Sequence, residues 1–185
     1  MPKSTFYKLT TEKQMTICQS ALEEFSTYDY AEASINRIIK QAKISRGSFY
    51  TYFDDKNDLY IYCMTTCLFN DKIDAKGNFY DFIVRVFDVL MTNGQKYPEF
   101  MEKVLLASTQ KQQMALWKTI NLTKSEQLRQ GFRFKAEKDL QIIWSLCQTI
   151  IWQSLTAYFI AHHSYQESKD LLLRQLLFLK IGIQG

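Results

Sequence analysis

Apolar side chains recur every three or four residues along most of this 185-residue chain, which is the spacing of one face of an α-helix. The first predicted helix begins at Thr11, where Gln14 completes a capping-box spacing, and ends near Ser26. Two short helices follow, one after Ser34 and one after Ser45, each with that serine as its N-cap. The first 55 residues are therefore expected to form a helix, a short helix, a tight turn and a second short helix.

The same spacing continues through the rest of the chain. Asp55 is the predicted cap of a longer helix that runs to about Ile73. An amphipathic helix from Phe79 is expected to end at Asn93-Gly94, and a shorter helix follows Pro98. A long helical segment is predicted from about residue 108 to residue 130, before Gly131.

The last two predicted helices, residues 136–161 and 165–181, carry more apolar residues than one stripe can hold. A helix that is apolar nearly all round is buried on more than one side. We expect the second side to pack against another copy of the chain, which would give a two-fold dimer. A central core helix is the alternative, and it explains the first of the two helices more easily than both.

Composition supports an all-α fold of about nine helices. The chain holds only two prolines, while hydrophobic residues make up 46% of it. No run approaches the roughly 18 uncharged apolar residues of a membrane span, and the first residues lack the apolar core of a signal peptide. The expected location is therefore the cytoplasm.

The net charge of +4 is concentrated in one short window. Residues 34–53 contain four cations and no acid, so the remaining chain carries 19 basic and 19 acidic side chains. A run of charge is usually a solvated helix face, but such faces mix signs, whereas a patch of one sign attracts polyanions. The cations are Arg37, Lys40, Lys43 and Arg46.

Within this window, the stretch RGSFYTYF places two small residues and one long cation at the start of a short helix. Arg46 is at the first helical position, where the helix dipole disfavours a cation unless a polyanion compensates. Gly47 and Ser48 let the backbone approach another surface closely, while Phe49 and Phe53 are expected to anchor the helix in its own core. This arrangement is typical of a recognition helix that enters the major groove of DNA.

The segment SINRIIKQAKISRGSFYTYFDDKNDLY, residues 34–60, resembles the helix-turn-helix of the TetR family of bacterial transcriptional regulators. The resemblance covers about fifty N-terminal residues. One departure is Lys43, where the family often has glycine; a left-handed backbone there costs about 1 kcal/mol for lysine. The positions that match the family pattern are Ser34, Ile38, Ala42, Ile44, Ser45, Gly47, Tyr50, Phe53, Lys56 and Leu59.

The resemblance implies a DNA-binding domain at residues 1–55 and an effector-binding and dimerisation domain at residues 56–185, connected by helix 56–73. It implies a repressor released from a palindromic operator by a small molecule. The two DNA-binding domains of the dimer would lie roughly 34 to 36 Å apart, or near a multiple of that spacing. Base edges would be approached by Arg46, Gly47 and Ser48, with Asn36 as a further reader. Phosphates would be met by Ser34, Tyr50, Thr51, Tyr52 and Lys56. For Arg46 the alternative is an exposed residue without a role, and for Tyr50 and Tyr52 it is partial burial in the core.

Candidate effector-binding residues are Met91, Trp117, Trp144 and Cys147, although an ordinary core explains each of them individually better than a ligand site does. Cys63 and Cys67 share a helix face, but with no histidine or third cysteine nearby they are better explained as small buried side chains than as metal ligands. The chain lacks a nucleophile elbow, a glycine-rich phosphate loop and paired histidines at ligand spacing. We therefore expect no enzyme and no cofactor.

Two other functions remain open. The chain could be a DNA-binding dimer controlled by a protein partner or by no ligand, its C-terminal bundle serving only for dimerisation. It could also be a helical adaptor whose N-terminal head no longer binds DNA. Binding to DNA at low salt separates the last possibility from the others.

Overall fold

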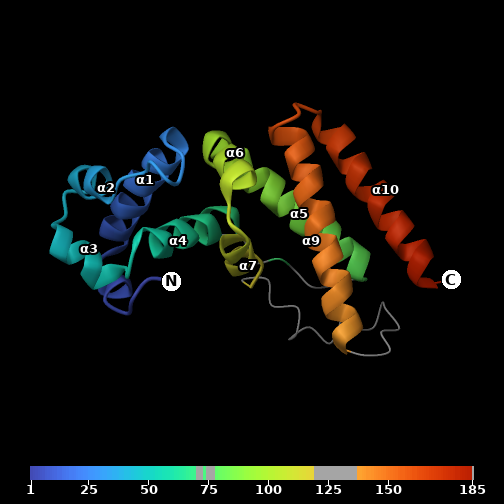
Figure 1. Ribbon diagram of the computed structural model, residues 1–185, viewed down its shortest axis with the longest axis horizontal. Helices are drawn as coiled ribbons and strands as arrows, with labels where there is room; N and C mark the ends of the chain where they lie inside the picture. Colours follow the sequence, from blue (N-terminus) through green and yellow to red (C-terminus); the bar gives the residue numbers. More distant parts are fainter. Residues whose placement is uncertain (70–72, 74–77, 119–136, 185) are drawn as a thin grey trace. The chain divides into compact units, whose positions relative to one another are not determined.

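The computed structural model describes residues 1–69, 73, 78–118 and 137–184. These residues form nine α-helices and one short 3-10 helix, without any strand (Figure 1), which confirms the all-α prediction. The elements are η1 (Phe6–Lys8), α1 (Thr11–Thr27), α2 (Ile35–Gln41), α3 (Arg46–Tyr52), α4 (Lys56–Leu68), α5 (Phe79–Gly94), α6 (Pro98–Ala107), α7 (Gln110–Lys118), α9 (Glu137–Phe159) and α10 (Tyr165–Gln184).

The chain divides into two compact units. The N-terminal unit consists of Met1–Asn70 and Tyr97–Leu116, so α4 and α6 pack with the first three helices. The C-terminal unit consists of Asp71–Lys96 and Trp117–Gly185 and contains α5, α9 and α10. This division follows packing; the functional division at residue 55 stays a prediction.

The starts of α3 and α4 have the predicted side-chain caps, whereas Ser34 precedes α2 without a side-chain cap hydrogen bond. Ser45 Oγ accepts a hydrogen bond from the Ser48 N–H at 3.0 Å, and an Asp55 carboxylate oxygen accepts one from the Asp58 N–H at 2.8 Å. For α1 the cap is Thr10 rather than Thr11, because the extended backbone lies at Thr10. Sequence alone does not separate two adjacent threonines.

Two predicted helix ends differ from the structure. The helix that begins at Lys56 ends at Leu68, and Ile73 lies outside any helix, so the prediction of one helix to residue 73 was wrong. Phe69, the C-cap, leaves helical geometry with φ −127° and ψ 39°. Of the long segment predicted at 108–130, the structure places Gln110–Lys118 in α7, while residues 119–130 lie outside the described part of the chain.

Aromatic rings hold the core of the N-terminal unit together. Tyr60 on α4 contacts Phe25 on α1 with ring centroids 4.9 Å apart, and Phe100 on α6 at 5.8 Å, both edge to face. Such pairs add about 0.5–1.5 kcal/mol each beyond the burial of their area. Phe49 and Phe53 are fully buried, as expected, and they fix α3 to this core.

The C-terminal unit buries one side of its helices and leaves large apolar side chains on the other. Its core includes Val86 and Leu90 of α5, Ile151 and Leu155 of α9, and Leu172 of α10. Besides Tyr165, four large apolar residues of α10 and two of α9 are exposed, with Phe178 the most open at 76%. They are Leu173, Leu177, Phe178, Ile181, Ile142 and Leu146. None of the described helices combines the length and apolar character that spanning a membrane requires.

Candidate nucleic-acid interface

The N-terminal end of α3 presents three consecutive residues outward. Arg46 and Gly47 are exposed and Ser48 is half-exposed, while Phe49 directly behind them is buried. A Cβ atom at Gly47 would make only ordinary contact, 3.7 Å from Ser45 Oγ. Packing within the chain therefore does not require glycine here, and the small side chain leaves room for an outside surface.

Arg46 is held by two residues that the sequence also placed in this site. Its Nη1 donates a hydrogen bond to Asn36 Oδ1 at 2.8 Å, which joins α3 to α2. Its Nη2 lies 3.4 Å from the Tyr50 hydroxyl, and the guanidinium carbon lies 5.7 Å from the centre of the Tyr50 ring. The exposed guanidinium therefore has a defined direction while keeping other donors for a partner.

The hydroxyl groups predicted to meet phosphate differ in exposure. Thr51 is exposed, and its Oγ1 donates to the Gly47 carbonyl at 3.1 Å. Tyr50 is exposed, whereas Tyr52 is half-buried with its ring 6.2 Å from Phe6. Ser34 is also half-buried. Its backbone N–H, rather than its side chain, makes the local hydrogen bond.

The turn between α2 and α3 has the left-handed backbone at Lys43 that its place in the turn suggested. Lys43 is left-handed with φ 51°, a conformation that costs a non-glycine residue about 1 kcal/mol. Lys13 on α1 compensates by donating from Nζ to the carbonyl oxygens of Ala42 at 3.1 Å and of Lys43 at 3.4 Å. Nothing in the sequence marks Lys13 for this role, because its partners are backbone atoms.

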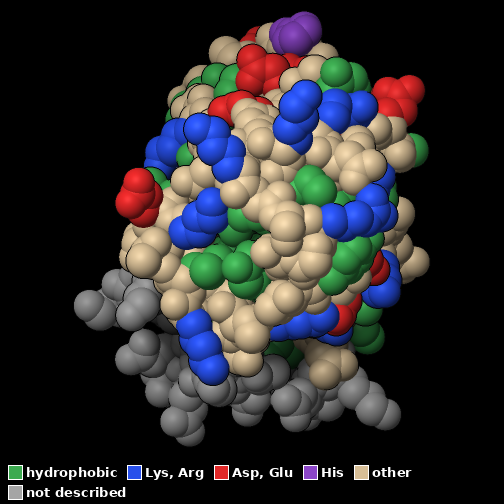
Figure 2. Space-filling view, turned by 90° about the vertical axis from the view of Figure 1, so that its left-hand side faces the viewer, with side chains coloured by type: hydrophobic (Ala, Val, Ile, Leu, Met, Phe, Trp, Pro, Cys, Tyr) green, Lys and Arg blue, Asp and Glu red, His purple; other side chains and the backbone are tan. Residues whose placement is uncertain are grey.

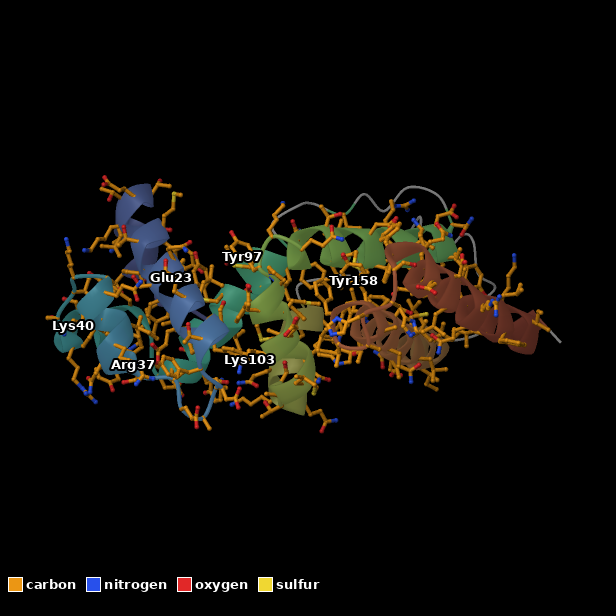
Figure 3. The ribbon with its side chains drawn as sticks, turned by 90° about the horizontal axis from the view of Figure 1, so that it is seen from above. Glu23, Arg37, Lys40, Tyr97, Lys103 and Tyr158 are labelled. Carbon is orange, nitrogen blue, oxygen red and sulfur yellow. The ribbon has the colours of Figure 1, made fainter. Side chains whose placement is uncertain are left out.

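A buried carboxylate fixes the start of α2. Glu24 on α1 accepts from the Ser34 N–H at 2.7 Å and from Arg37 Nε at 2.9 Å, and Arg37 Nη2 lies 2.6 Å from the same carboxylate. Burial, the largest influence, raises the pKa of Glu24, but these hydrogen bonds and the nearby charges outweigh it and lower the pKa. Arg37 thus has a structural partner. It is labelled together with Lys40 of the same helix in Figure 3.

Lys56 lies half-buried at the start of α4 and faces the α1–α2 connection. Its Nζ donates to the carbonyl oxygens of Tyr30 at 2.6 Å, Ala33 at 2.8 Å and Ala31 at 3.2 Å. Burial lowers the pKa of Lys56, opposed by the carboxylate of Glu24. An ammonium group has three donors, so this geometry gives Lys56 a structural role. Its contact with phosphate stays a prediction.

Figure 2 shows how charge is distributed over the end of the N-terminal unit that carries α2 and α3. Lys and Arg side chains are spread around a centre of uncharged atoms, and acidic side chains lie mostly toward the rim. Lys40 on α2, Lys43 in the turn and Arg46 on α3 are exposed. A surface of this kind favours a polyanion over a neutral partner.

The structure brings two of the four effector candidates into direct contact. In the C-terminal unit, the rings of Trp117 and Trp144 lie 5.8 Å apart, edge to face. Trp152, which the sequence analysis did not select, lies 6.3 Å from Trp117, and Phe82 of α5 lies 6.3 Å from Trp144. The sequence signal for Trp152 was its place on α9, eight residues after Trp144 and on the same face.

The other two effector candidates are core residues. Cys147 on α9 is fully buried, and burial raises the pKa of its thiol to about 12, so the thiol is protonated at neutral pH. Met91 is buried nine residues beyond Phe82 on α5, about 13 Å farther along the helix axis. It therefore occupies a different level of the core from the tryptophan cluster.

Comparison with known proteins places the helix-turn-helix in a family. Residues 17–63 match the family model described as bacterial regulatory proteins, tetR family. Over 48 residues, 26% of this chain, the sequence is 42% identical to an uncharacterized HTH-type transcriptional regulator, YuxN, of Bacillus subtilis (strain 168). The match spans only 16% of that relative.

Similar structures extend over nearly the whole chain. A TetR-family transcriptional regulator from Syntrophomonas wolfei is 18% identical, with a TM-score of 0.62 over 96% of this chain and 97% of that one. FadR from Bacillus subtilis, solved in complex with stearoyl-CoA, is 17% identical, with a TM-score of 0.60 over 92% of this chain and 98% of that one. These likenesses concern the fold of both units.

Proposed function

This chain belongs to the TetR family of bacterial transcriptional regulators, and we propose that it acts in the cytoplasm as a homodimer that binds a palindromic DNA operator through α2 and α3. The observation that carries the proposal is the exposed, oriented Arg46 beside Gly47 and Ser48, on a surface poor in acidic groups. Arg46 reads a guanine edge, the geometry for which an arginine fork is best suited. Because the side chains of Gly47 and Ser48 are small, the backbone of α3 can come close enough to the bases for Arg46 to reach them.

Asn36 has two roles in this proposal. It orients Arg46 in the free protein, and its amide group can contact a base once Arg46 turns toward the groove. Hydroxyl groups of Ser34, Tyr50, Thr51 and Tyr52 contact phosphates at the edges of the site. Of these, Thr51 and Tyr50 are the most open in the free protein.

The exposed apolar residues of α9 and α10 support the dimer. A palindrome is recognised by two heads related by two-fold symmetry, so one chain alone reads only half of the site. The second copy would cover Leu177, Phe178 and Ile181, which are open in a single chain.

The proposed repressor is released by a small molecule bound in the C-terminal unit. Trp117 and Trp144, with Trp152 beside them, are the side chains whose environment such a ligand would change. Met91 and Cys147 would contribute only through the core behind them. Because FadR of Bacillus subtilis was solved with stearoyl-CoA, a long-chain acyl-CoA is a reasonable first compound to test.

The DNA-binding part is tested by measuring affinity for a selected palindromic duplex at several salt concentrations. The logarithm of the binding constant should fall with the logarithm of salt concentration with a slope of about −4 to −8, because each protomer displaces counterions from a few phosphates. Binding that does not change with salt would overturn the proposal.

The effector part is tested by titrating stearoyl-CoA while tryptophan fluorescence and operator affinity are both recorded. The expected result is a saturable fluorescence change together with weaker operator binding. If no acyl-CoA or other small molecule changes either signal, regulation by a protein partner or by no ligand becomes the better account. In that case DNA binding itself would be unaffected.

A further inference from the structure

Residues Lys3 to Phe6, before α1, lie against the C-terminal end of α3, and we call them the N-terminal arm. The Lys3 N–H donates to the Tyr52 carbonyl at 2.8 Å, and Lys3 Nζ donates to the Tyr50 carbonyl at 2.8 Å. The Thr5 hydroxyl donates to the Thr51 carbonyl. Three consecutive carbonyl groups of α3 therefore have their partners in a segment more than forty residues earlier in the chain.

Helix α3 needs these partners because its own C-terminal cap, the Phe53 N–H, satisfies only one of its last four carbonyl groups. The last four carbonyl groups of a helix lack a partner within it. In α3 the first of the four, Phe49, accepts from the Phe53 N–H at 2.9 Å, after which the backbone becomes extended at Phe53 with φ −132°. The remaining three carbonyls are those that the N-terminal arm takes.

The N-terminal arm is itself fixed to the core of the N-terminal unit. Phe6 is fully buried, and its ring centroid lies 5.0 Å from Phe53 and 5.2 Å from Tyr62 on α4. Lys3 Nζ also lies 2.7 Å from an Asp54 carboxylate oxygen. Its positive charge stands at the negative end of the α3 dipole, which is the favourable end. The arm thus connects the end of α3 to an anchored ring.

We propose that Lys3 and Thr5 are positioning residues for DNA recognition, which set the direction of α3 and hence of Arg46. This inference rests on the proposed function and adds to it a part of the chain outside the helix-turn-helix. A helix of seven residues is marginal alone and depends on what holds its two ends. Ser45 holds the first end and the N-terminal arm holds the second. A recognition side chain on a loosely held helix loses the geometry that its site requires.

The first test measures amide hydrogen exchange of the free protein, which needs no DNA. Thr5→Val keeps the shape of the side chain but leaves the Thr51 carbonyl without its donor, while Thr5→Ser keeps the hydroxyl. We expect the amides of α3 to exchange about fivefold faster in Thr5→Val, the size of one hydrogen bond, and to return to wild-type rates in Thr5→Ser. Lys3→Met should accelerate exchange of the α3 amides as Thr5→Val does. Lys3→Arg should leave the rates at wild-type values as Thr5→Ser does.

A matched control separates a local effect from general loss of stability. Thr16 on α1 also donates its hydroxyl to a backbone carbonyl, that of Glu12 at 2.9 Å, and its side chain is exposed. Thr16→Val should leave the exchange rates of α3 unchanged. If Thr16→Val accelerates α3 as much as Thr5→Val does, or if Thr5→Val does not accelerate it, the positioning role is overturned.

The second test measures binding to the operator selected by the wild-type protein and to an unrelated duplex. Thr5→Val and Lys3→Met should weaken operator binding about fivefold and leave binding to the unrelated duplex within about twofold, because a misdirected α3 loses base contacts before phosphate contacts. Lys8→Met, which removes an exposed charge from η1, is the control for charge alone. Equal losses in Lys8→Met and Lys3→Met would contradict positioning.

The two tests fail in different ways. If the wild-type protein binds no DNA, the proposed function is wrong, and the exchange rates still decide whether the N-terminal arm caps α3. If the protein binds its operator and the Thr5 and Lys3 variants bind as tightly as wild type, the function stands and the positioning role is wrong.

Discussion

The surface formed by α2 and α3 and the surface formed by α9 and α10 carry different kinds of side chain. In the N-terminal unit, exposed polar groups such as Arg46 and Asn36 hold one another through specific hydrogen bonds, above a core of buried rings. In the C-terminal unit, α9 and α10 leave leucine, isoleucine and phenylalanine side chains in the open. The first surface therefore carries charged and hydrogen-bonding groups of fixed direction, whereas the second exposes large apolar side chains.

This difference determines what each surface can reveal. Hydrogen-bond donors at fixed positions indicate a class of partner, because their direction and charge restrict what they can bind. An exposed apolar surface indicates a binding partner that covers it, but many kinds of partner can bury apolar side chains. The sequence match to the family model covers residues 17–63 and so belongs to the first surface.

The largest expected effect concerns the buried side of α3. Phe49→Ala should lower the free energy of unfolding of the N-terminal unit by about 3–5 kcal/mol, since it leaves a cavity beneath the recognition residues. Urea denaturation measures this loss. Tyr50→Ala, at an exposed position of the same helix, is the control and should cost less than about 1 kcal/mol. Equal costs would mean that α3 is not anchored as described.

The next effect tests whether the apolar surface of α10 is an interface. Phe178→Glu should weaken the dimer by about 2–4 kcal/mol, because it places an unpaired charge where a second copy would bury it. Sedimentation equilibrium gives the dimer dissociation constant. Leu106→Glu is the control, since Leu106 is similarly exposed at 68% but lies in the N-terminal unit. A wild-type protein that is already monomeric would refute the interface.

A smaller effect concerns the charge network that begins α2. The pKa of Glu24 is lowered in the folded protein from its ordinary 4.5, so the folded state binds this proton less readily than the unfolded state. The stabilisation from its ionised form is therefore full above about pH 5 and is lost as pH falls through the folded-state pKa.

Glu24→Gln tests this network. At pH 7 it should cost about 2 kcal/mol, since Arg37 loses a charged partner but is itself half-exposed. Both the loss of stability at pH 7 and its dependence on pH are measured by thermal unfolding between about pH 3 and pH 7, because this range includes the titration of a carboxyl group. In Glu24→Gln the stability lost on acidification should be smaller than in wild type. An unchanged dependence of stability on pH would show that Glu24 does not cause this loss.

The smallest effect tests the hydrogen bond between Arg46 and Asn36. Arg46→Ala should weaken operator binding by about 1–3 kcal/mol, and Asn36→Ala by about 1 kcal/mol. If Asn36 acts mainly by orienting Arg46, the double variant should lose little more than Arg46→Ala alone. Competition binding measures all three. Fully additive losses would make Asn36 an independent reader.

Much of the N-terminal unit could be predicted because its signals are local. Ser45 and Asp55 cap their helices as expected, and Lys43 has the left-handed geometry that its place in the turn suggested. The cap of α1 was misplaced by one residue, at Thr11 instead of Thr10, because neighbouring threonines are equally good caps.

What could not be predicted depends on contacts between distant residues and backbone atoms. Lys3 and Thr5 cap α3, Lys13 holds the turn, and Lys56 binds the α1–α2 connection, in every case through carbonyl groups. Every residue has a carbonyl group, so the sequence carries no mark of which one a lysine will reach. The tryptophan cluster likewise depends on how Trp117 meets Trp144 and Trp152 of α9 within the C-terminal unit.

The most direct test of the central claim is selection of DNA fragments from a random pool by the purified protein, followed by sequencing. If α3 reads DNA from a two-fold dimer, the enriched fragments will share two inverted half-sites whose centres lie roughly 34–36 Å apart or near a multiple of that spacing. The same selection with Arg46→Ala should lose preference at one base pair of each half-site. Failure of the wild-type protein to enrich any sequence at low salt would contradict the account.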